Sequence, residues 1–273
     1  MIYQNHIPKF PLDNYIDRII YLEGNNKGTG LPKTAMSLIF NLEDNFKLFT
    51  DQNFTNYIDY KKHWVAGLQT KPTNVESYGI SKMLVVQFKT LGAFTFLNDP
   101  LHYYTDNYIP LDNIFNKDAD ETWEQLQEAQ TINEKLLIME NFLYRKLLSN
   151  KLPNQKLIST IEILFDKNTN LSINDICKQM NISRKHLNNL SKEYVGVSPK
   201  MLSSLNRLQT SLKKISSSKP EKFTDLAYEL EYFDQAHFNN DFKLFTNLKP
   251  TEYVKLVENN PTLKIIPHFI PFQ

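Results

Sequence analysis

The sequence contains a single cysteine, Cys177, among 273 residues. An internal disulfide is therefore excluded, and a cysteine-rich scaffold is excluded with it. So little cysteine suits a reducing compartment, and we expect a cytoplasmic protein. We interpret Cys177 as a small packing residue on the buried face of a helix.

Glycine is also scarce, and its seven residues argue against a glycine-rich nucleotide-binding architecture. The chain has no Gly-x-Ser-x-Gly elbow, no P-loop and no Gly-x-Gly-x-x-Gly stretch. The histidines His6, His63 and His102 are too far apart to form a pair with metal-ligand spacing. We therefore expect no catalytic residue, no metal and no cofactor.

No segment approaches the roughly 18 apolar residues of a membrane-spanning helix, so we expect no membrane partner. Residues 1–6 lack the basic start and apolar run of a secretory signal. Apolar residues make up 41% of the chain and charged residues 22%, as in ordinary globular proteins. The length favours two domains, each able to bury its own core.

The net charge of +1 conceals an uneven distribution along the chain. Residues 1–150 contain 14 Lys and Arg against 18 Asp and Glu, a net charge of −4. Residues 151–258 contain 16 basic and 12 acidic residues, a net charge of +4. This asymmetry is typical of a nucleic-acid-binding module joined to a second domain, although chance produces such a difference as well.

The first 116 residues have the pattern of a β-rich domain. Short runs of β-branched and aromatic residues predict strands at 16–22, 36–42 and 83–88. Turn formers at 24–26 and 78–79 bound them, and 46–49 is predicted to be the return arm of a hairpin. The spacing indicates a β-sandwich or small barrel, whose interior can hold one small ligand.

Six aromatic residues follow one another near the end of this β-rich region. They are Phe88, Phe94, Phe96, Tyr103, Tyr104 and Tyr108. They either line an apolar ligand pocket or belong to the core, and core packing is the commoner role for such residues.

From Asp120 onward the apolar residues recur with helical spacing. Thr131 and Glu134 fit a capping box at the start of a helix with a broad apolar stripe. The stripe comprises Ile132, Leu136, Leu137, Met139, Phe142, Leu143, Leu147 and Leu148. It packs either on the β-rich domain or on a second copy of the chain. The segment 152–154, Leu-Pro-Asn, is the expected domain boundary.

The second half is predicted to be helical. A stripe at 157–165 indicates one helix, and Ser172 is placed to cap a short helix that carries Cys177. A tight turn at 181–182 follows, and Ser183 caps the next helix. A short helix, a tight turn and a second helix with a polar outer face make a helix-turn-helix unit.

This unit occurs twice, at an offset of 51 residues. The stretch His186-Leu187-Asn188-Asn189 to Lys192 and Pro199 recurs as His237-Phe238-Asn239-Asn240 to Lys243 and Pro250. Self-similarity of this kind indicates a duplicated supersecondary unit. Thr224 lies near the start of the second short helix, and Asp234 caps the second long one.

Each of the two long helices has an apolar inner side and a polar outer side. We predict base contacts from Arg184, Asn188, Gln235 and Asn239, whose side chains suit guanine and adenine edges in a major groove. We predict phosphate or groove contacts from Lys185, Asn189, Lys192, Asn240 and Lys243. The bland alternative is an ordinary solvated face, and the second copy weighs against it.

A long segment with helical spacing joins the copies. It starts at Pro199, continues to Ile215 and ends at 216–220, Ser-Ser-Ser-Lys-Pro. About 17 residues at ~1.5 Å per residue make a rod of roughly 25 Å. Such a rod could place two recognition helices about one DNA turn, ~34 Å, apart on one face of the duplex.

Residues 155–257 resemble the DNA-binding domain of the AraC/XylS family of transcription regulators. The stretch from Asp225-Leu226-Ala227 through Phe233-Asp234-Gln235-Ala236-His237-Phe238 to Pro250-Thr251-Glu252-Tyr253 is similar to the motif of that family, and Gly196-Val197-Ser198-Pro199 matches its partner motif. The resemblance implies two helix-turn-helix units joined by a long helix and bound in successive major grooves. It also implies an N-terminal sensor or dimerisation domain, often with a cupin-like β-fold.

Four positions depart from the family pattern. Glu231 stands where glycine is usual in the second turn, and a positive φ there would strain it. Asn247 replaces the glycine of a helix C-cap, and Ser191 replaces a core aromatic residue. Asp241 puts an acid on the second recognition helix, so we expect the first unit to carry more of the base recognition.

The sequence therefore predicts an α+β multidomain protein. Residues 1–152 form a β-rich sensor or dimerisation domain of sandwich or barrel type, residues 153–258 an all-α double helix-turn-helix domain, and residues 259–273 a tail. We expect a regulator, activator or repressor, that binds double-stranded operator or promoter DNA and the transcription machinery. A small-molecule effector and a homodimer are expected as further partners. The alternative is an enzyme or a structural dimerisation domain fused to a DNA-binding tether.

Overall fold

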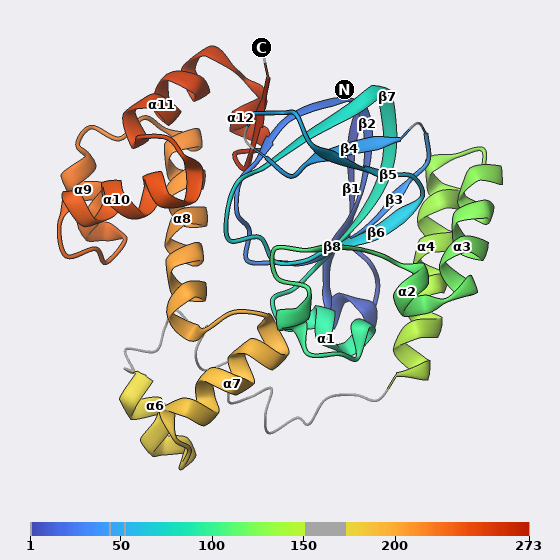
Figure 1. Cartoon of the computed structure of the whole chain (residues 1–273), viewed down its shortest axis with the longest axis horizontal. Coiled ribbons are helices and arrows are strands. Elements are labelled where there is room, and N and C mark those ends of the chain that lie inside the picture. The colour runs from blue at the N-terminus through green and yellow to red at the C-terminus, as the bar shows by residue number, and fades with distance from the viewer. Residues whose placement is uncertain (1, 44, 52, 151–172, 273) are drawn as a thin grey trace.

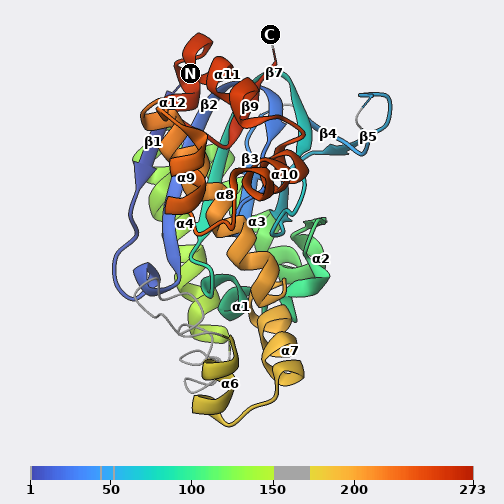
Figure 2. The ribbon, with the colours of Figure 1, turned by 90° about the vertical axis from the view of Figure 1, so that its left-hand side faces the viewer.

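The computed structural model describes residues 2–43, 45–51, 53–150 and 173–272 of the chain. A β-rich domain flanked by helices forms the N-terminal part, and a helical domain forms the C-terminal part (Figure 1). This arrangement agrees with the predicted α+β fold class. The last described residues return to the N-terminal sheet, and both termini lie at the same end of the molecule (Figures 1 and 2).

The nine strands of the described residues form one sheet with antiparallel pairing. Its main order is β1-β2-β7-β3-β6-β8, and β4, β5 and β9 pair off this path. The strands are β1 (Ile2–His6), β2 (Ile16–Gly30), β3 (Ser37–Asn41), β4 (Phe46–Phe49), β5 (Tyr57–Tyr60), β6 (His63–Ala66), β7 (Thr73–Phe88), β8 (Tyr108–Pro110) and β9 (Phe269–Pro271).

The central strands β2 and β7 are longer than predicted. They pair with each other over nearly their whole length and pass through the turn formers at 24–26 and 78–79, so the turns predicted there are wrong. Residues 77–79 of β7 instead bulge opposite Asn26, whose Nδ2 donates to Ser81 Oγ at 2.6 Å. The bulge bends the strands without ending them.

The hairpin predicted for residues 46–49 is also wrong. These residues form β4, but β4 pairs with β5 and with the outer end of β7. The preceding strand, β3, is paired with β6 on one side and β7 on the other. Both edges of β3 are therefore occupied, and long-range pairing decides where β4 goes.

The two faces of the sheet have different neighbours because successive side chains of a strand point to opposite sides. On one face, Leu38, Phe40 and Val86 are buried in the main hydrophobic core. On the other face, Ile39 and Val85 border a cavity. The helices of the N-terminal domain cover the first face and leave the second to the C-terminal domain (Figure 1).

Helix α4 packs on the core face of the sheet. Packing on the β-rich domain was one of the two alternatives predicted for its apolar stripe. Its capping box is confirmed, because the Thr131 side chain accepts from the Glu134 amide while Glu134 accepts from the Thr131 amide. Phe142 is fully buried and meets the Phe40 ring edge-on at 5.8 Å between centroids. The N-terminal helices are α1 (Gly92–Leu97), α2 (Asp112–Phe115), α3 (Lys117–Glu128) and α4 (Ile132–Ser149), with short 3-10 turns η1 (Leu12–Asn14) and η2 (Leu101–Tyr103).

The C-terminal domain contains a long central helix with smaller helices at both ends (Figures 1 and 2). Its described helices are α6 (Ile173–Met180), α7 (Arg184–Val195), α8 (Pro199–Ser217), α9 (Phe223–Glu229), α10 (Gln235–Thr246), α11 (Pro250–Asn259) and α12 (Thr262–Ile265). The helix predicted at 157–165, the boundary at 152–154 and the cap at Ser172 lie outside the described residues. Within those residues, no helix combines the length and the apolar character that a membrane crossing requires.

Candidate nucleic-acid interface and effector cavity

The first helix-turn-helix unit consists of α6 and α7. Asn181 forms the turn with a φ of 52°, and the Ser183 side chain accepts a hydrogen bond from the His186 amide at 3.1 Å. This bond confirms Ser183 as the cap of the recognition helix α7. Cys177 is buried against Leu187 across the turn, which confirms its role in packing.

The second unit, α9 and α10, repeats this construction with different residues. Asp234 caps the recognition helix α10 by accepting from the His237 amide at 2.7 Å. Glu231 occupies the turn with a φ of 60°, so the strained alternative predicted for this position is confirmed. Asn247 ends α10 in the left-handed conformation, with a φ of 59°.

Both recognition helices present the predicted side chains outward. Their inner sides are buried through Leu187 and Leu190 in α7 and through Phe238 and Phe242 in α10. None of the nine predicted DNA-contacting residues is buried, and most are exposed. They are Arg184, Lys185, Asn188, Asn189 and Lys192 on α7, and Gln235, Asn239, Asn240 and Lys243 on α10.

The first residue of each recognition helix is held by the preceding helix. Arg184 Nε donates to Asn174 Oδ1 at 2.5 Å, and Thr224 Oγ1 donates to Gln235 Oε1 at 2.7 Å. Asn174 and Thr224 are each the second residue of their helices, α6 and α9. The two units therefore orient their leading polar side chains in the same way.

Asp241, the acid on the second recognition helix, lies beside basic groups of its own domain. Its Oδ2 lies 3.7 Å from an Arg207 guanidinium nitrogen and 4.0 Å from His237 Nε2. Arg207 belongs to α8, and its guanidinium lies 4.6 Å from the centre of the Tyr232 ring. Arg207 thus offsets the acid on α10, a role that sequence spacing cannot show because the partners are far apart in the chain.

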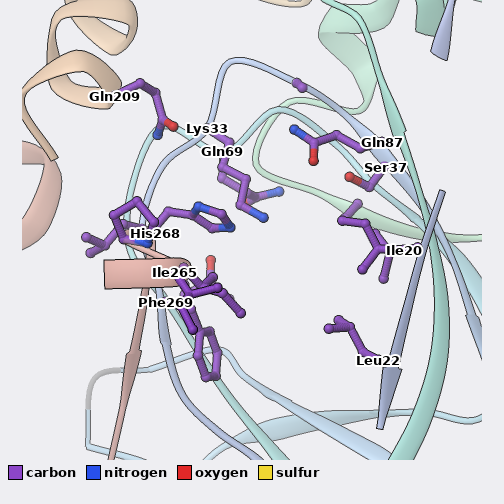
Figure 3. A pocket seen from close by; sticks show the side chains of 18 of the residues that line it. Ile20, Leu22, Lys33, Ser37, Gln69, Gln87, Gln209, Ile265, His268 and Phe269 are labelled. Carbon is purple, nitrogen blue, oxygen red and sulfur yellow. The ribbon is translucent and has the colours of Figure 1, made fainter. Parts of the chain in front are cut away.

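A cavity of about 1060 Å³ lies between the second face of the sheet, α8 and the segment from α12 to β9. Its size suits a small ligand, for which typical pockets measure roughly 300–1,000 Å³. Apolar side chains such as Ile20 and Leu22 form one wall, while Lys33, Gln69 and His268 point into the space from the other side (Figure 3).

The charged groups that line this cavity are all basic. They are Arg18, Lys33, Lys213, Lys214 and Lys264. His268 also lines the cavity, and no Asp or Glu belongs to the lining within the described residues. Two of them are already paired, since Arg18 Nε lies 2.6 Å from Asp17 Oδ2 and Lys214 binds Glu229. Lys33 has no hydrogen-bond or ion-pair partner in the part of the chain that the structure describes.

Burial shifts the titration of two of these groups. Loss of hydration lowers the pKa of the Lys33 ammonium from 10.5 to about 8. Loss of hydration, together with repulsion from Lys33 and Arg18, lowers the pKa of His268 well below its ordinary value. A negatively charged ligand bound here would offset the repulsion between these basic groups. Neither residue was predicted from the sequence, because Lys33 is a lone loop lysine and His268 lies in the expected tail.

Most of the six clustered aromatic residues belong to the core, as the commoner of their two expected roles requires. Phe88, Phe96 and Tyr104 are buried, and Phe94 packs against the same core while half-buried. Tyr103 is 62% exposed. Only Tyr108 of the six lines the cavity.

His63 is a buried link between elements and does not line the cavity. Its Nδ1 lies 3.5 Å from Asp112 Oδ1 and its Nε2 lies 3.4 Å from Asp120 Oδ1. The imidazole therefore connects β6 with α2 and α3. Within residues 2–43, 45–51, 53–150 and 173–272, no group of three or more His, Cys, Asp or Glu could hold a metal ion.

Comparisons with known proteins divide the chain in the same way as the fold. Residues 176–256 match a family model described as a helix-turn-helix domain, and residues 4–110 match one described as a domain of unknown function, DUF6597. The raffinose operon transcriptional regulatory protein RafR of Pediococcus pentosaceus is 29% identical over 89 residues. That match covers 33% of this chain, which spans about a third (32%) of the length of RafR.

The comparison with solved structures matched this chain to two further proteins. ToxT from Vibrio cholerae superimposes with a TM-score of 0.48 at 14% identity, covering 87% of this chain and 98% of that one. The AraC-like transcriptional activator CuxR has a TM-score of 0.30 at 12% identity, covering 71% and 76% of the two chains. On the evidence of the two capped units and the matching family model, residues 176–256 are a helix-turn-helix domain, as the resemblance to the AraC/XylS family implied.

Proposed function

We propose that this protein is a sequence-specific regulator of transcription that binds double-stranded DNA and performs no chemistry of its own. The observation that carries this proposal is the pair of similarly capped recognition helices, each with a polar outer side, joined by the 19-residue helix α8. At ~1.5 Å per residue, α8 is about 28 Å long, close to one turn of DNA at ~34 Å. Its partners are then operator DNA and the transcription machinery, and its compartment is the cytoplasm.

The contacts divide into two classes by side-chain chemistry. Arg184, Asn188, Gln235 and Asn239 read base edges, and Lys185, Asn189, Lys192, Asn240 and Lys243 contact phosphates or the groove. The hydrogen bonds from Arg184 to Asn174 and from Thr224 to Gln235 favour this division, because they fix the leading side chains before DNA arrives. Pre-oriented side chains lose less conformational entropy on binding.

Selection of bound duplexes from a random DNA library tests the proposal. Enrichment of two short elements about one helical turn, ~10.5 base pairs, apart is expected from two recognition helices on one face of the duplex. The variant Arg184→Ala should lose preference within one element only, and Gln235→Ala within the other. Absence of any enriched sequence would overturn sequence-specific binding, and a single element would overturn the double reader.

The cavity supports control of this regulator by an amphipathic anion. Its apolar wall includes Ile20 and Leu22, and its opposite side carries the unpaired cation Lys33 near His268. A small molecule with an apolar body and one carboxylate or sulfonate group can pack its body on the apolar wall and place its anionic group beside Lys33. An enzyme that uses acid–base carboxylates would need Asp or Glu in this lining, and the described lining contains neither.

The fluorescent anion 8-anilinonaphthalene-1-sulfonate is a suitable probe of the cavity. Wild type should bind it with saturable fluorescence, and Lys33→Met, which keeps the apolar stem, should weaken binding by about tenfold, since charge-assisted contacts contribute roughly 1.5–3 kcal/mol. Lys71→Met removes a lysine outside the lining and serves as the matched control. Equal affinity of Lys33→Met and wild type would contradict an anion site.

The outer side of α4 supports a homodimer as a second property. Leu137, Tyr144 and Leu148 follow one line along the helix and are 58%, 44% and 69% exposed. A second copy of the same helix would cover this stripe. Sedimentation velocity tests this. Wild type should sediment as a dimer and Leu148→Lys more as a monomer. Glu121→Lys on α3 should sediment as wild type does. A monomeric wild type contradicts the dimer.

A further inference from the structure

The C-terminal end of the chain pairs with the N-terminal sheet. Strand β9 runs antiparallel to the end of β2, with Gly28 opposite Pro271 and Gly30 opposite Phe269. The Leu31 amide donates to the His268 carbonyl at 2.8 Å, and the Phe272 amide donates to the Lys27 carbonyl at 3.0 Å. Residues 266–272, which we call the C-terminal strap, therefore bridge the helical domain and the sheet (Figure 1).

The C-terminal strap forms one side of the cavity. Ile266, Pro267, His268 and Phe269 all belong to its lining, and the labelled His268 and Phe269 lie across the space from Ile20 and Leu22 (Figure 3). Removal of the strap would open the cavity between β2 and α8. An occupant that fills the cavity therefore contacts the strap directly.

The other end of the strap is attached to the second helix-turn-helix unit. Tyr253 of α11 donates its hydroxyl proton to the Pro267 carbonyl at 2.5 Å, and its side chain is fully buried. The Tyr253 ring packs against Phe242 of the recognition helix α10, with 5.8 Å between ring centroids. Leu263 of α12 is fully buried as well, and α12 packs on α8. A continuous set of contacts thus leads from the strap to α10.

Gly28 is the residue that lets the strap lie on β2. A Cβ atom built at Gly28 would be 2.4 Å from the Ile270 carbonyl oxygen and 2.9 Å from Pro271 Cα, both backbone atoms of the strap. At Gly30, two residues away on the same strand, a Cβ atom meets nothing closer than 3.7 Å. Neither glycine has a left-handed φ, so alanine at either position fits the conformation of β2 itself.

We propose that the C-terminal strap closes the cavity and couples its occupancy to the second helix-turn-helix unit. This inference rests on the effector cavity of the proposed function. When a ligand fills the cavity, its contacts with the strap stabilise the seated strand β9, and the bond from Tyr253 to Pro267 extends this stabilisation to α11 and α10. When the strap leaves β2, the cavity opens and the second unit loses one of its attachments to the N-terminal domain.

Hydrogen exchange on the full chain, with and without 8-anilinonaphthalene-1-sulfonate, tests the coupling. In wild type, the probe should slow exchange of the Leu31 amide and of amides in α11. In Gly28→Ala, both regions should exchange at least about tenfold faster, since several strand hydrogen bonds are lost, and the probe should no longer protect α11. Its dissociation should accelerate by a similar factor. Gly79→Ala on β7 is the matched control and should behave as wild type does, because its Cβ atom would meet nothing within 4 Å and Gly79 does not line the cavity.

Tyr253→Phe provides a second variant that keeps the buried ring and removes only the hydroxyl group. Probe binding should then still protect the Leu31 amide, and protection of α11 should be lost. Wild-type behaviour of Gly28→Ala would overturn the closing role, and persistent protection of α11 in Tyr253→Phe would overturn the coupling. A wild type that binds the probe without protecting α11 would also overturn the coupling while leaving the anion cavity intact. Absence of probe binding in wild type would overturn the coupling and the anion cavity together.

Discussion

Thr105 Oγ1 donates a 2.8 Å hydrogen bond to the backbone carbonyl of Gly196, the residue that ends the first recognition helix. Gly196 has a φ of 103°, which favours glycine. Beside this bond, the Phe94 and Tyr194 rings lie 4.3 Å apart between centroids. The first helix-turn-helix unit is therefore attached to the N-terminal domain at the C-terminal end of α7, while the N-terminal end of α7 stays exposed.

Thr105→Val should loosen this attachment. Loss of the hydroxyl leaves the Gly196 carbonyl without that donor, and we expect the free energy of unfolding to fall by about 1 kcal/mol. Urea denaturation measures the change, and Thr105→Ser, which keeps the hydroxyl, should restore most of it. If the valine and serine variants are equally stable, the hydrogen bond contributes nothing to the attachment.

Lys192→Ala should weaken binding to every DNA sequence to the same degree. A lysine that contacts phosphate releases about one counterion on binding, so the slope of log K against log salt should become shallower by about 0.9. Titrations of a selected operator and of unrelated DNA measure this slope. They cover salt concentrations from about 50 to about 200 mM, where the loss of affinity with salt is large. Lys117→Ala on α3 is the control, and an unchanged slope in Lys192→Ala would refute the phosphate contact.

Binding of an anion in the cavity should depend on pH through Lys33. Burial lowers the pKa of this lysine to about 8, so the free protein carries the charge below that pH and loses it above. A bound anion raises the pKa again, and affinity should therefore be constant below pH 8 and fall by up to about tenfold per pH unit above it. Fluorescence titration with 8-anilinonaphthalene-1-sulfonate measures the profile. Lys33→Met should bind more weakly and show no such fall.

The same shift has a consequence for stability with the opposite sign. The folded pKa of Lys33 is lower than its ordinary value of 10.5, so between pH 8 and 10.5 the unfolded chain binds more protons than the folded one. The unfavourable contribution of the buried charge is thus fully present below pH 8 and is relieved as the pH rises. Comparison of wild type with Lys33→Met by denaturation across this range separates this effect from those of other groups.

Glu231→Gly should stabilise the second helix-turn-helix unit. Glu231 has a φ of 60°, a conformation that costs a side chain other than glycine about 1–2 kcal/mol. Part of this gain is offset because glycine loses roughly 0.5–1 kcal/mol more conformational entropy on folding. We expect a net stabilisation of about 0.5–1 kcal/mol in thermal unfolding. Glu231→Ala keeps the strain and should give no gain, and equal stability of both variants would show that strain at this turn is negligible.

The sequence by itself determined the local structure of the C-terminal domain. Ser183 and Asp234 were recognisable as caps because capping depends on residues three apart in the chain. The duplicated pattern from His186 and from His237 marked both recognition helices and their outward faces for the same reason. Helix α4 and its capping box were predictable from the spacing of Thr131 and Glu134.

Only the tertiary structure decided how distant segments meet. β2 and β7 continue through glycine and asparagine because each satisfies the backbone of the other, and β3 leaves no free edge for β4. Arg207 meets Asp241, and the charge of Lys33 acts on His268, through packing of segments that no local spacing relates. The cavity and the strap that closes it exist because residues at opposite ends of the chain share one sheet, a long-range pairing that neither composition nor periodicity encodes.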